Sequence, residues 1–523
     1  MKRNSPFLLF SLLLILALAC NYPRGTAKPT KLSARDLRLT LAAQSSGTAL
    51  STTSAIEGTW SPVATTIIGS DTATPESTSF SESTVSLVVV APGIFQYSVH
   101  SGDTLPALAG RFGVEPEQIT SEQPVPAEVF IPIGQLLKIP NTVGETPYPG
   151  VLLPDSEAIN SPSAVEFDIQ EFVDRSSGYL SNYSERVNNQ WTSGADIIQR
   201  VAMEYSINPR LLLALLEYRS GWVLGQPVDP DRINYPIGFH VSGWNGLHKE
   251  LAIAATHFNV GYYGWRLGTV TKLAFQDGSS ARMNPGLNPG TVAVQNLFAK
   301  LYKQYQWRDA LYGQQNFLTL YQQMFGDPWS RAAEIEPLFN TDLVQPTLEL
   351  PFRAGERWSL TGGPHLSWKT GSSPGALDLA PVTGEPRCVV SYTWVTASAK
   401  GLVVRSIRNT VVIDLDGDGF EQTGWSVLYL HVADTERIPS GMWVEVNDPI
   451  GHPSCEGGNA TGTHVHIARK YNGEWITAYG PLPMVLSGWV AFAGEKDYLG
   501  GIRKGEQVAV ASPVGPRTSI VIR

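Results

Sequence analysis

Hydrophobic and polar positions follow four different patterns along this 523-residue chain. An apolar run occupies residues 7–19, and Ser, Thr, Ala and Gly dominate residues 45–86. Helical spacing of apolar residues prevails between about residues 166 and 345, and strand-like alternation prevails after about residue 350. A chain of this length exceeds one hydrophobic core and predicts roughly two to four domains. We therefore expect a multidomain α+β protein.

The first residues have the features of an export signal. Lys2 and Arg3 precede the apolar run, which ends in Leu16-Ala17-Leu18-Ala19-Cys20. Small residues before a cysteine resemble the bacterial lipoprotein signal, which implies a signal peptide over residues 1–20 and lipid attachment at Cys20. A simple cleaved signal with an incidental Cys20 is the alternative. We interpret residues 21–92 as a Ser/Thr-rich disordered tether, because this composition buries too little apolar area to offset ordering entropy.

Residues 93–141 combine strand and helix signals in a short space. Apolar residues recur at helical spacing from Leu105 to Phe112, and Gly113 follows as a helix end. The Gly-Asp-Thr-Leu start and the Gly-Gln-x-Leu-x-Ile-Pro end resemble a LysM module. This resemblance implies a β-α-α-β fold that binds N-acetylglucosamine-containing glycans such as peptidoglycan. It places the glycan contacts at residues 131–134 and at Gly102, Asp103, Thr104 and Leu105. A spacer without a ligand is the alternative.

A Pro-, Gly- and Ser-rich linker at residues 142–165 precedes a helical domain at residues 166–345. Residues 207–222 resemble the first catalytic helix of lysozyme-like transglycosylases, which place a general-acid Glu directly before a Ser-Gly pair. Here Arg219 occupies that position, and arginine cannot exchange a proton near neutral pH. Glu217 stands two residues before Arg219 and lies about 200° away from it round the helix. We predict a lysozyme-like but catalytically silent domain. An active domain that uses Glu217 and an unrelated helical bundle are the alternatives.

After residue 350, four runs of β-branched and apolar residues predict a mostly antiparallel β domain over residues 346–490, followed by a short β appendage at residues 491–523. The four runs are residues 389–392, 402–405, 410–414 and 427–431. Since alternate side chains of a strand point to one face, His464 and His466 are expected to share a site, and Tyr429 shares a strand face with His431. A catalytic zinc ion needs three protein ligands and one open position.

These histidines resemble those of lysostaphin-like zinc metallopeptidases with a LytM-type domain. The Gly362-Gly363-Pro364-His365 start, the distant Asp378 and the 453–458 turn point to the beta-lytic and staphylolysin branch. The resemblance implies one Zn²⁺ held by His365, Asp378 and His466, with His431 and His464 as the catalytic pair. We expect His464 to act as general base and His431 to stabilise the oxyanion, although the sequence leaves the two roles interchangeable. Tyr429 is a candidate substrate contact.

Two smaller features of the β domain carry further expectations. If Cys20 holds lipid, Cys388 and Cys455 remain, and a disulfide between them is permitted outside the cytoplasm. The alternating carboxylates of Asp414, Asp416 and Asp418 indicate either a Ca²⁺ loop or an acidic hairpin turn. Trp425 stands where a calcium loop has its twelfth-position Glu, which counts against the first reading.

Charge narrows the range of partners. The net charge is −9 and no basic block occurs, which argues against a nucleic-acid partner. The resemblances to a lipoprotein signal, a LysM module and the lysostaphin-like metallopeptidases together imply an extracytoplasmic zinc endopeptidase, lipid-anchored to the bacterial cell membrane and facing the cell wall, that cuts cross-links or stem peptides of peptidoglycan. A non-catalytic wall-binding scaffold, or an activator of another wall hydrolase, is the first alternative. A glycan-cleaving helical domain with an accessory peptidase is the second.

Overall fold

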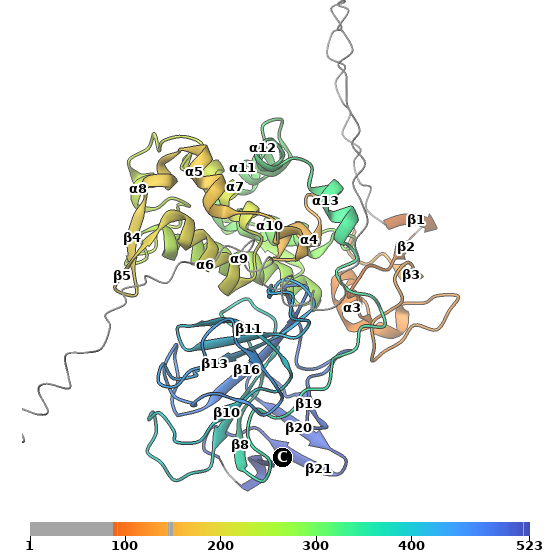
Figure 1. Cartoon of the computed structure of the whole chain (residues 1–523). Helices are drawn as coiled ribbons and strands as arrows, with labels where there is room; N and C mark the ends of the chain where they lie inside the picture. The colour runs from red at the N-terminus through yellow and green to blue at the C-terminus, as the bar shows by residue number, and fades with distance from the viewer. Residues whose placement is uncertain (1–86, 92, 145, 147–149, 516) are drawn as a thin grey trace, which may run out of the picture. The chain divides into compact units, whose positions relative to one another are not determined.

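The computed structural model describes residues 87–91, 93–144, 146, 150–515 and 517–523 (Figure 1). The predicted signal peptide, Cys20 and nearly all of the predicted tether lie outside the described residues. None of the helices in the described ranges is long and apolar enough to cross a bilayer. The described elements form a small β-sheet module, a helical domain and a β-rich domain, which together are the multidomain α+β architecture that the sequence predicts.

The first module is a three-stranded antiparallel sheet with one helix. Its strands are β1 (Leu87–Ala91), β2 (Ile94–Ser98) and β3 (Leu136–Pro140), and its helix is α3 (Leu105–Phe112). The Thr104 side chain accepts the N–H of Ala107 at 3.3 Å at the start of α3, and Gly113 ends the helix with φ 66°. The predicted second helix is reduced to a 3₁₀ turn, Pro116–Gln118. Strand β1 lies within the range predicted as tether.

The helical domain follows the predicted apolar periodicity. Helices α6 (Gly194–Tyr205) and α7 (Pro209–Ser220) contain the predicted apolar faces, and the Asn208 side chain caps α7 through the N–H of Arg210. The apolar run at residues 307–325 is broken at Asn316, which caps a new helix. The other helices are α4 (Asp155–Ala158), α5 (Ile169–Ser176), α8 (Asp231–Asn234), α9 (Leu247–Arg266), α10 (Pro289–Leu301), α11 (Gln304–Tyr312), α12 (Phe317–Phe325) and α13 (Pro328–Ile335).

Short 3₁₀ turns and two hairpins complete the helical domain. The turns are η2 (Pro162–Ala164) and η3 (Tyr179–Asn182), and the hairpins are β4 (Ser184–Val187) with β5 (Gln190–Ser193) and β6 (Lys272–Ala274) with β7 (Ser280–Arg282).

The β-rich domain is built on a nine-stranded antiparallel sheet with the order β14-β11-β12-β13-β16-β9-β8-β22, in which β17 also pairs with β16. The strands are β8 (Arg357–His365), β9 (Ala376–Pro381), β11 (Gly401–Ile407), β12 (Thr410–Asp414), β13 (Trp425–Leu430), β14 (Trp443–Val444), β16 (Val465–Tyr471), β17 (Glu474–Trp475) and β22 (Ile520–Ile522). The small pair β10 (Val395–Thr396) and β15 (Pro449–Gly451) lies outside this sheet.

Three of the four predicted strands are confirmed, and the strand predicted at residues 389–392 is wrong. This stretch forms turns and irregular structure, and Tyr392 is 68% exposed. The Glu385 carboxylate accepts the Tyr392 N–H at 3.1 Å and the Ser391 hydroxyl at 2.5 Å. Side-chain hydrogen bonds to the backbone thus replace a strand ladder here.

The predicted C-terminal appendage is β structure, but its last strand belongs to the main sheet. Strands β18 (Val485–Leu486), β19 (Trp489–Ala493), β20 (Gly500–Lys504) and β21 (Gln507–Val510) form a separate antiparallel sheet. After the 3₁₀ turn η4 (Arg517–Ser519), strand β22 returns to pair with β8.

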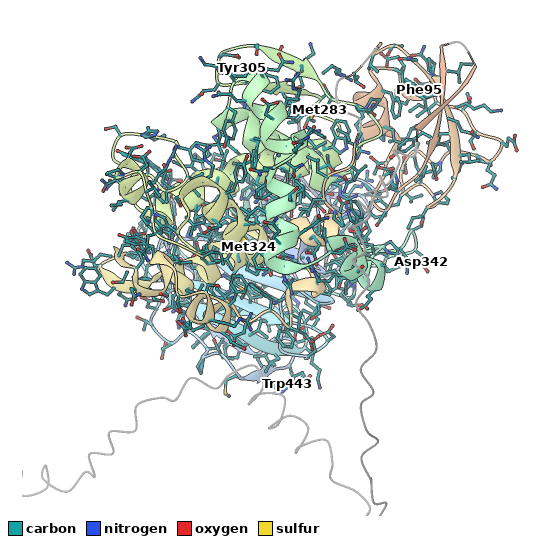
Figure 2. All side chains as sticks on the ribbon, turned by 90° about the horizontal axis from the view of Figure 1, so that it is seen from above. Phe95, Met283, Tyr305, Met324, Asp342 and Trp443 are labelled. Carbon is teal, nitrogen blue, oxygen red and sulfur yellow. A yellow bond between two sulfur atoms is a disulfide. The ribbon has the colours of Figure 1, made fainter. Side chains whose placement is uncertain are left out.

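The two faces of the main sheet are buried in different cores. On β13, Leu428 and Leu430 pack with the helical domain, whereas Val427 and Tyr429 pack in the core of the β domain. Side chains of the described residues fill the space between the ribbons (Figure 2). The sheet that carries the candidate chemistry is therefore covered by helices on one face.

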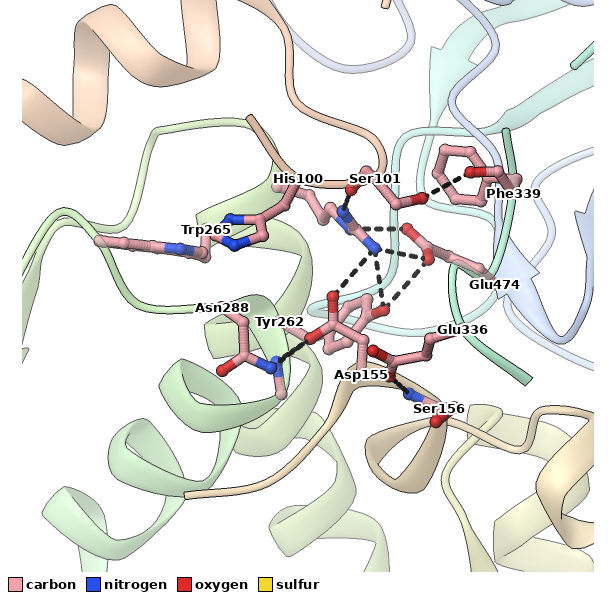
Figure 3. A network of polar contacts seen from close by, with 12 residues as sticks. His100, Ser101, Asp155, Ser156, Tyr262, Trp265, Asn288, Glu336, Phe339 and Glu474 are labelled. Carbon is pink, nitrogen blue, oxygen red and sulfur yellow. Dashed lines mark hydrogen bonds and ion pairs between the residues drawn. The ribbon is translucent and has the colours of Figure 1, made fainter. Parts of the chain in front are cut away.

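Arg266, a buried residue at the end of α9, joins the three parts of the described chain. Figure 3 labels its partners Ser101, Asp155 and Glu474. The Arg266 guanidinium donates to the backbone carbonyl of Ser101 in the first module and lies 3.3 Å from the Asp155 carboxylate in the helical domain. It also contacts Glu474 on β17 at 2.9 Å, and the Tyr262 hydroxyl donates to Glu474 at 3.0 Å. Arg266 and Glu474 are both buried.

Removal of one partner of this pair leaves a buried charge uncompensated, which costs about 3–5 kcal/mol. We expect Arg266→Met and Glu474→Gln each to lower the free energy of unfolding by this order, and the double variant to lose less than the sum of the two. Urea unfolding followed by tryptophan fluorescence measures the cycle. Lys400→Met, in the exposed Lys400–Glu445 pair, is the control and costs about 1 kcal/mol or less. Equal effects at the two pairs would contradict the prediction.

Candidate metal centre and catalytic site

Strand register brings the predicted metal ligands together. His466 on β16 lies directly opposite Asp378 on β9, so that their side chains are neighbours on one face of the sheet. Gly362 on β8 faces Asp378 from the other side, and His365 follows at the end of β8 after a register shift. A Cβ at Gly362 would lie 2.7 Å from Asp378 Oδ2, so this position needs glycine to leave room for the carboxylate.

Three donor atoms from these residues converge at one point. His365 Nε2 lies 3.1 Å from His466 Nδ1 and 3.3 Å from Asp378 Oδ1, and His466 Nδ1 lies 3.2 Å from Asp378 Oδ1. All three side chains are buried. Tetrahedral zinc, with ligand bonds of about 2.0–2.1 Å, separates two donors by about 3.3 Å. The spacing of the donor set therefore fits zinc.

The tautomers of both ligand histidines are fixed by backbone carbonyls on their far sides. His365 Nδ1 hydrogen-bonds the Gly363 carbonyl at 2.8 Å, and His466 Nε2 hydrogen-bonds the Ser367 carbonyl at 2.9 Å. These far nitrogens must carry the protons, because a carbonyl oxygen only accepts. In the neutral rings, His365 Nε2 and His466 Nδ1 then carry lone pairs, which point at each other and at the Asp378 carboxylate. Such an arrangement is stable with a cation between the donors.

The charges of the centre follow from burial and from contact between its members. Burial acts to raise the pKa of Asp378, but His365 and His466 outweigh it and hold this pKa well below its ordinary value. Burial acts to lower the pKa of His365, but the Asp378 carboxylate outweighs it and raises this pKa. Burial lowers the pKa of His466. Asp378 is thus an anionic ligand at neutral pH.

The two predicted catalytic histidines lie beside this centre. Their ring centroids are 4.4 Å apart, and His464 Nε2 lies 3.7 Å from Asp378 Oδ1. His431 Nδ1 hydrogen-bonds the Glu456 carbonyl and His464 Nδ1 hydrogen-bonds the Gly462 carbonyl, each at 2.7 Å. Burial, together with His464, lowers the pKa of His431 to about 4, so His431 is neutral at pH 7. The Nε2 atom of the neutral His431 ring is therefore available as an acceptor.

The predicted disulfide is confirmed and lies next to the catalytic pair. Cys388 and Cys455 are bonded, and Glu456, whose carbonyl orients His431, follows Cys455 directly. Cys388 lies in a turn with φ 57° and not in the predicted strand. The bond therefore ties two irregular segments together beside the site.

Sequence reasoning missed Tyr498, which belongs to the C-terminal β appendage. Its ring stacks on the His365 ring with centroids 4.1 Å apart, and its backbone N–H donates to the Pro364 carbonyl at 3.1 Å. A cavity of about 420 Å³ is lined by Asp378, His464 and Tyr498. Tyr498 lies between β19 and β20 of the second sheet, and no local motif connects it with His466.

Two predicted substrate contacts occupy structural positions instead. Tyr429 is fully buried in the core of the β domain, and its hydroxyl accepts the Ser398 N–H at 2.8 Å. Asp103 is 1% exposed, and its carboxylate accepts bonds from Arg111 and from the Tyr97 hydroxyl, each at 2.7 Å.

Of the other predicted glycan contacts, Gly102, Thr104 and Leu105 lie nearer to solvent, whereas Ile131 is buried. Gly102 and Thr104 line a second cavity, of about 270 Å³, whereas Leu105 packs partly against the core of its own module. Arg266 and Phe339 of the helical domain line the same cavity.

Comparisons with known proteins agree with this arrangement. Residues 97–140 match the family described as LysM domain, which confirms the first module, and residues 151–338 match the family described as LasA, N-terminal domain. The chain is 25% identical over 364 residues to Protease LasA of Pseudomonas aeruginosa strain PAO1, a match that covers 65% of this chain and 78% of that protein.

Two further relatives are beta-lytic metalloendopeptidases. The enzyme of Achromobacter lyticus is 30% identical over 159 residues, covering 29% of this chain and 39% of that protein. The enzyme of Lysobacter enzymogenes is 28% identical over the same length, covering 82% of that protein. Among solved structures, the M23 metalloprotease pseudoalterin from the deep sea matches with a TM-score of 0.28 and 21% identity, over 34% of this chain and 100% of that chain.

The buried His-Asp-His set and the homology to these metalloendopeptidases define an enzyme of the zinc metalloendopeptidase class. The chain is LasA-like in the particular sense that a LysM domain and a LasA N-terminal-type domain accompany the peptidase domain. The comparisons give no support to the lysozyme-like resemblance of the helical domain, which matches the LasA N-terminal family instead.

Loss of any ligand should abolish stoichiometric zinc binding. We expect His365→Ala, Asp378→Asn and His466→Ala to bind far less than one zinc per chain, because two donors do not hold the ion against dialysis. His452→Ala is the control. Both ring nitrogens of His452 are hydrogen-bonded, to the Thr393 carbonyl and to the Glu436 carboxylate, so its loss should leave the zinc content unchanged. Atomic absorption after dialysis measures the ratio. Full zinc retention in all three ligand variants would contradict the site.

Zinc affinity should fall on acidification. The raised pKa of His365 means that the metal-free centre keeps a proton up to and above the ordinary histidine range near pH 6.5, and zinc must displace this proton. Below the pKa of His365 the apparent dissociation constant should rise about tenfold per pH unit, and above it the constant should level off. Competition with a chromophoric chelator between about pH 5 and 8 measures the slope. A flat profile would exclude His365 as a ligand.

Proposed function

We propose that this chain is an exported zinc endopeptidase that hydrolyses the peptide cross-links or stem peptides of bacterial peptidoglycan. The observation that carries the proposal is the convergence of His365, Asp378 and His466 within one buried donor set, with two further histidines beside it. Three protein donors leave the fourth zinc position for a water molecule, as catalytic zinc sites require. The adjoining cavity of about 420 Å³ supports access by an extended peptide.

Zinc held by His365, Asp378 and His466 would supply a Lewis acid that polarises the scissile carbonyl and acidifies water. His464 Nε2 takes the proton from the attacking water, and the nearby Asp378 carboxylate stabilises the charged ring. His431 stabilises the oxyanion, which requires a proton on its Nε2.

The Glu456 carbonyl fixes the His431 Nδ1 proton, so a neutral His431 presents a lone pair at Nε2. His431 therefore acts as a donor only after it gains a second proton or exchanges tautomers. This geometry supports the reverse assignment equally, with His431 as base and His464 as donor. In both assignments one ring accepts and the other donates.

The LysM module supplies the proposed attachment to the glycan. Gly102 and Thr104 lie at the cavity of about 270 Å³, and Ile133 in the second predicted contact loop is exposed. Asp103 supports this loop from the interior and does not touch the sugar. Binding of the glycan would keep the peptidase near its substrate and raise its effective concentration.

We further propose that the helical domain has no glycosidase activity. The Glu217 carboxylate accepts the N–H groups of Val223 and Leu224, at 2.8 and 2.9 Å, and so closes the end of α7. Arg219, in the position of the general acid of the transglycosylases, donates to the Ile237 carbonyl. Both side chains have structural partners.

The proposal includes a location at the bacterial cell membrane, outside the cytoplasm. Lipid on Cys20 would anchor the chain to the bacterial cell membrane, with the peptidase facing the wall. The disulfide between Cys388 and Cys455 is compatible with such an oxidising compartment.

Substitution of either catalytic histidine should separate chemistry from metal binding. We expect His464→Ala and His431→Ala to retain one zinc and to release peptidoglycan fragments about 10²–10⁴-fold more slowly, because each removes one proton-transfer or oxyanion contact. Dye release from labelled cell walls and metal analysis measure the two quantities on the mature chain.

The products distinguish the alternatives. Mass spectrometry should find new peptide amino termini and no new reducing ends in the wild-type digest. A wall-binding scaffold would release equal, background amounts in wild type and His464→Ala. New reducing ends that persist in His464→Ala and vanish in Glu217→Gln would favour a glycan-cleaving helical domain.

A further inference from the structure

The loop between β12 and β13 holds a second group of candidate ligands. One carboxylate oxygen each of Asp414, Asp416 and Asp418 lies within 4.8 Å of the others. These residues alternate along the chain and are followed by Gly419, which has φ 94°. They share no residue with the zinc centre.

Asp414 is the anomaly in this group. Its side chain is 0% exposed; Oδ2 accepts the N–H of Gly419 at 2.9 Å, whereas Oδ1 has no donor among the residues that the structure describes. Burial and the adjacent Asp416 carboxylate raise the pKa of Asp414 to about 7. A buried carboxylate in contact with another carboxylate is costly unless a cation compensates it.

The described residues provide no such cation. Among the ion pairs between described residues, Arg405 contacts Glu421 from the same loop, at 2.9 Å, but no basic side chain pairs with the three aspartates. The hydrogen bonds of the turn leave one buried oxygen of Asp414 without a donor among the described residues. Asp416 accepts the N–H of Asp418 at 3.3 Å, and Asp418 accepts the N–H of Phe420 at 2.9 Å. Asp414 is not needed for either bond.

We propose that Asp414, Asp416 and Asp418 bind a calcium ion. The donors are all oxygen, which Ca²⁺ prefers, and a loop of alternating carboxylates tolerates its flexible coordination better than the strict octahedron of Mg²⁺. Trp425 replaces the bidentate Glu of tight calcium loops, so the affinity falls in the range of extracellular modules, with a dissociation constant of about 10⁻⁴–10⁻³ M. This inference does not depend on the peptidase activity.

The ion would fix one end of the β12–β13 hairpin, whose other end leads to His431. Asp414 is paired with Ser426 across the hairpin next to the loop. Gly424 and Asn472 exchange two hydrogen bonds of 2.9 Å each, and Asn472 donates to the Leu338 carbonyl at 2.6 Å. The calcium loop is therefore continuous with the contacts between the sheet and the helical domain.

The fluorescence of Trp443, which contacts this loop, can be used to follow the ordering of the loop. Gly417 lies against the ring of Trp443, where a Cβ would come within 2.2 Å. Trp443 is 48% exposed and lies at the margin of the folded part in Figure 2. Its fluorescence should respond to ordering of residues 414–419.

CaCl₂ is titrated into calcium-free, zinc-loaded protein. Binding is followed by microcalorimetry, by tryptophan fluorescence and by the thermal unfolding midpoint. We expect one saturable site and a rise of about 5 °C in the first unfolding midpoint at about 10 mM CaCl₂. Asp416→Asn/Asp418→Asn should lose both responses, because asparagine keeps the turn acceptors but removes the charge. Asp309→Asn/Glu445→Gln removes two exposed carboxylates elsewhere and should respond like the wild type.

Comparison of the double variant with the wild type in calcium-free solution tests whether the carboxylates serve calcium binding or stabilise the turn directly. There, Asp416→Asn/Asp418→Asn should unfold at the same or a higher temperature than the wild type, because like-charge repulsion is relieved. A lower midpoint would mean that the carboxylates stabilise the turn directly and would overturn the proposal. Absence of saturable binding up to about 10 mM CaCl₂, or equal binding in the double variant, would also overturn it.

Discussion

The metal centre depends on the register between three neighbouring strands. Because β16 and β9 place His466 opposite Asp378, and β8 brings Gly362 to the other side of Asp378, two ligands meet with no loop to position them. Backbone carbonyls then fix which nitrogen of each ring carries the proton. A shift of one residue in either ladder would turn a ligand to the opposite face of the sheet. The rigidity of an antiparallel sheet is thus converted directly into ligand geometry.

The donor set was predicted by a family resemblance, and strand periodicity added only that His464 and His466 share a site. The resemblance to lysostaphin-like metallopeptidases implied His365, Asp378 and His466 as ligands, and the fold brings their donor atoms within 3.3 Å. Helical periodicity predicted α6 and α7 equally well, because their apolar faces are long. The strand prediction failed at residues 389–392, where the side chain of Glu385 competes for backbone groups. Tyr498 and the burial of Tyr429 and Asp103 arise from tertiary contacts that no local pattern encodes.

The helical domain contributes to the peptidase as a packing partner. One face of the sheet shares a core with it, and Arg266 links Glu474, close to the His-x-His strand, with the LysM module. Buried ion pairs of this kind add little net stability against an apolar alternative, but they penalise every arrangement in which one partner is left alone. The network therefore favours the arrangement in which Arg266 contacts both Glu474 and Ser101. The same side chains connect the segment around Ser101 with β17, the neighbour of β16.

The final strand has a consequence for biogenesis. Strand β22 pairs with β8, the strand that ends in His365, and the hydrogen bond between Ser359 and Ser519 joins positions 160 residues apart. Contacts of such long range form late in folding, since the intervening chain must first be closed into a loop. During synthesis the edge of β8 stays open until β22 has been made. The strand that ends in His365 therefore gains its full set of neighbours only after residues 520–522 have folded back onto it.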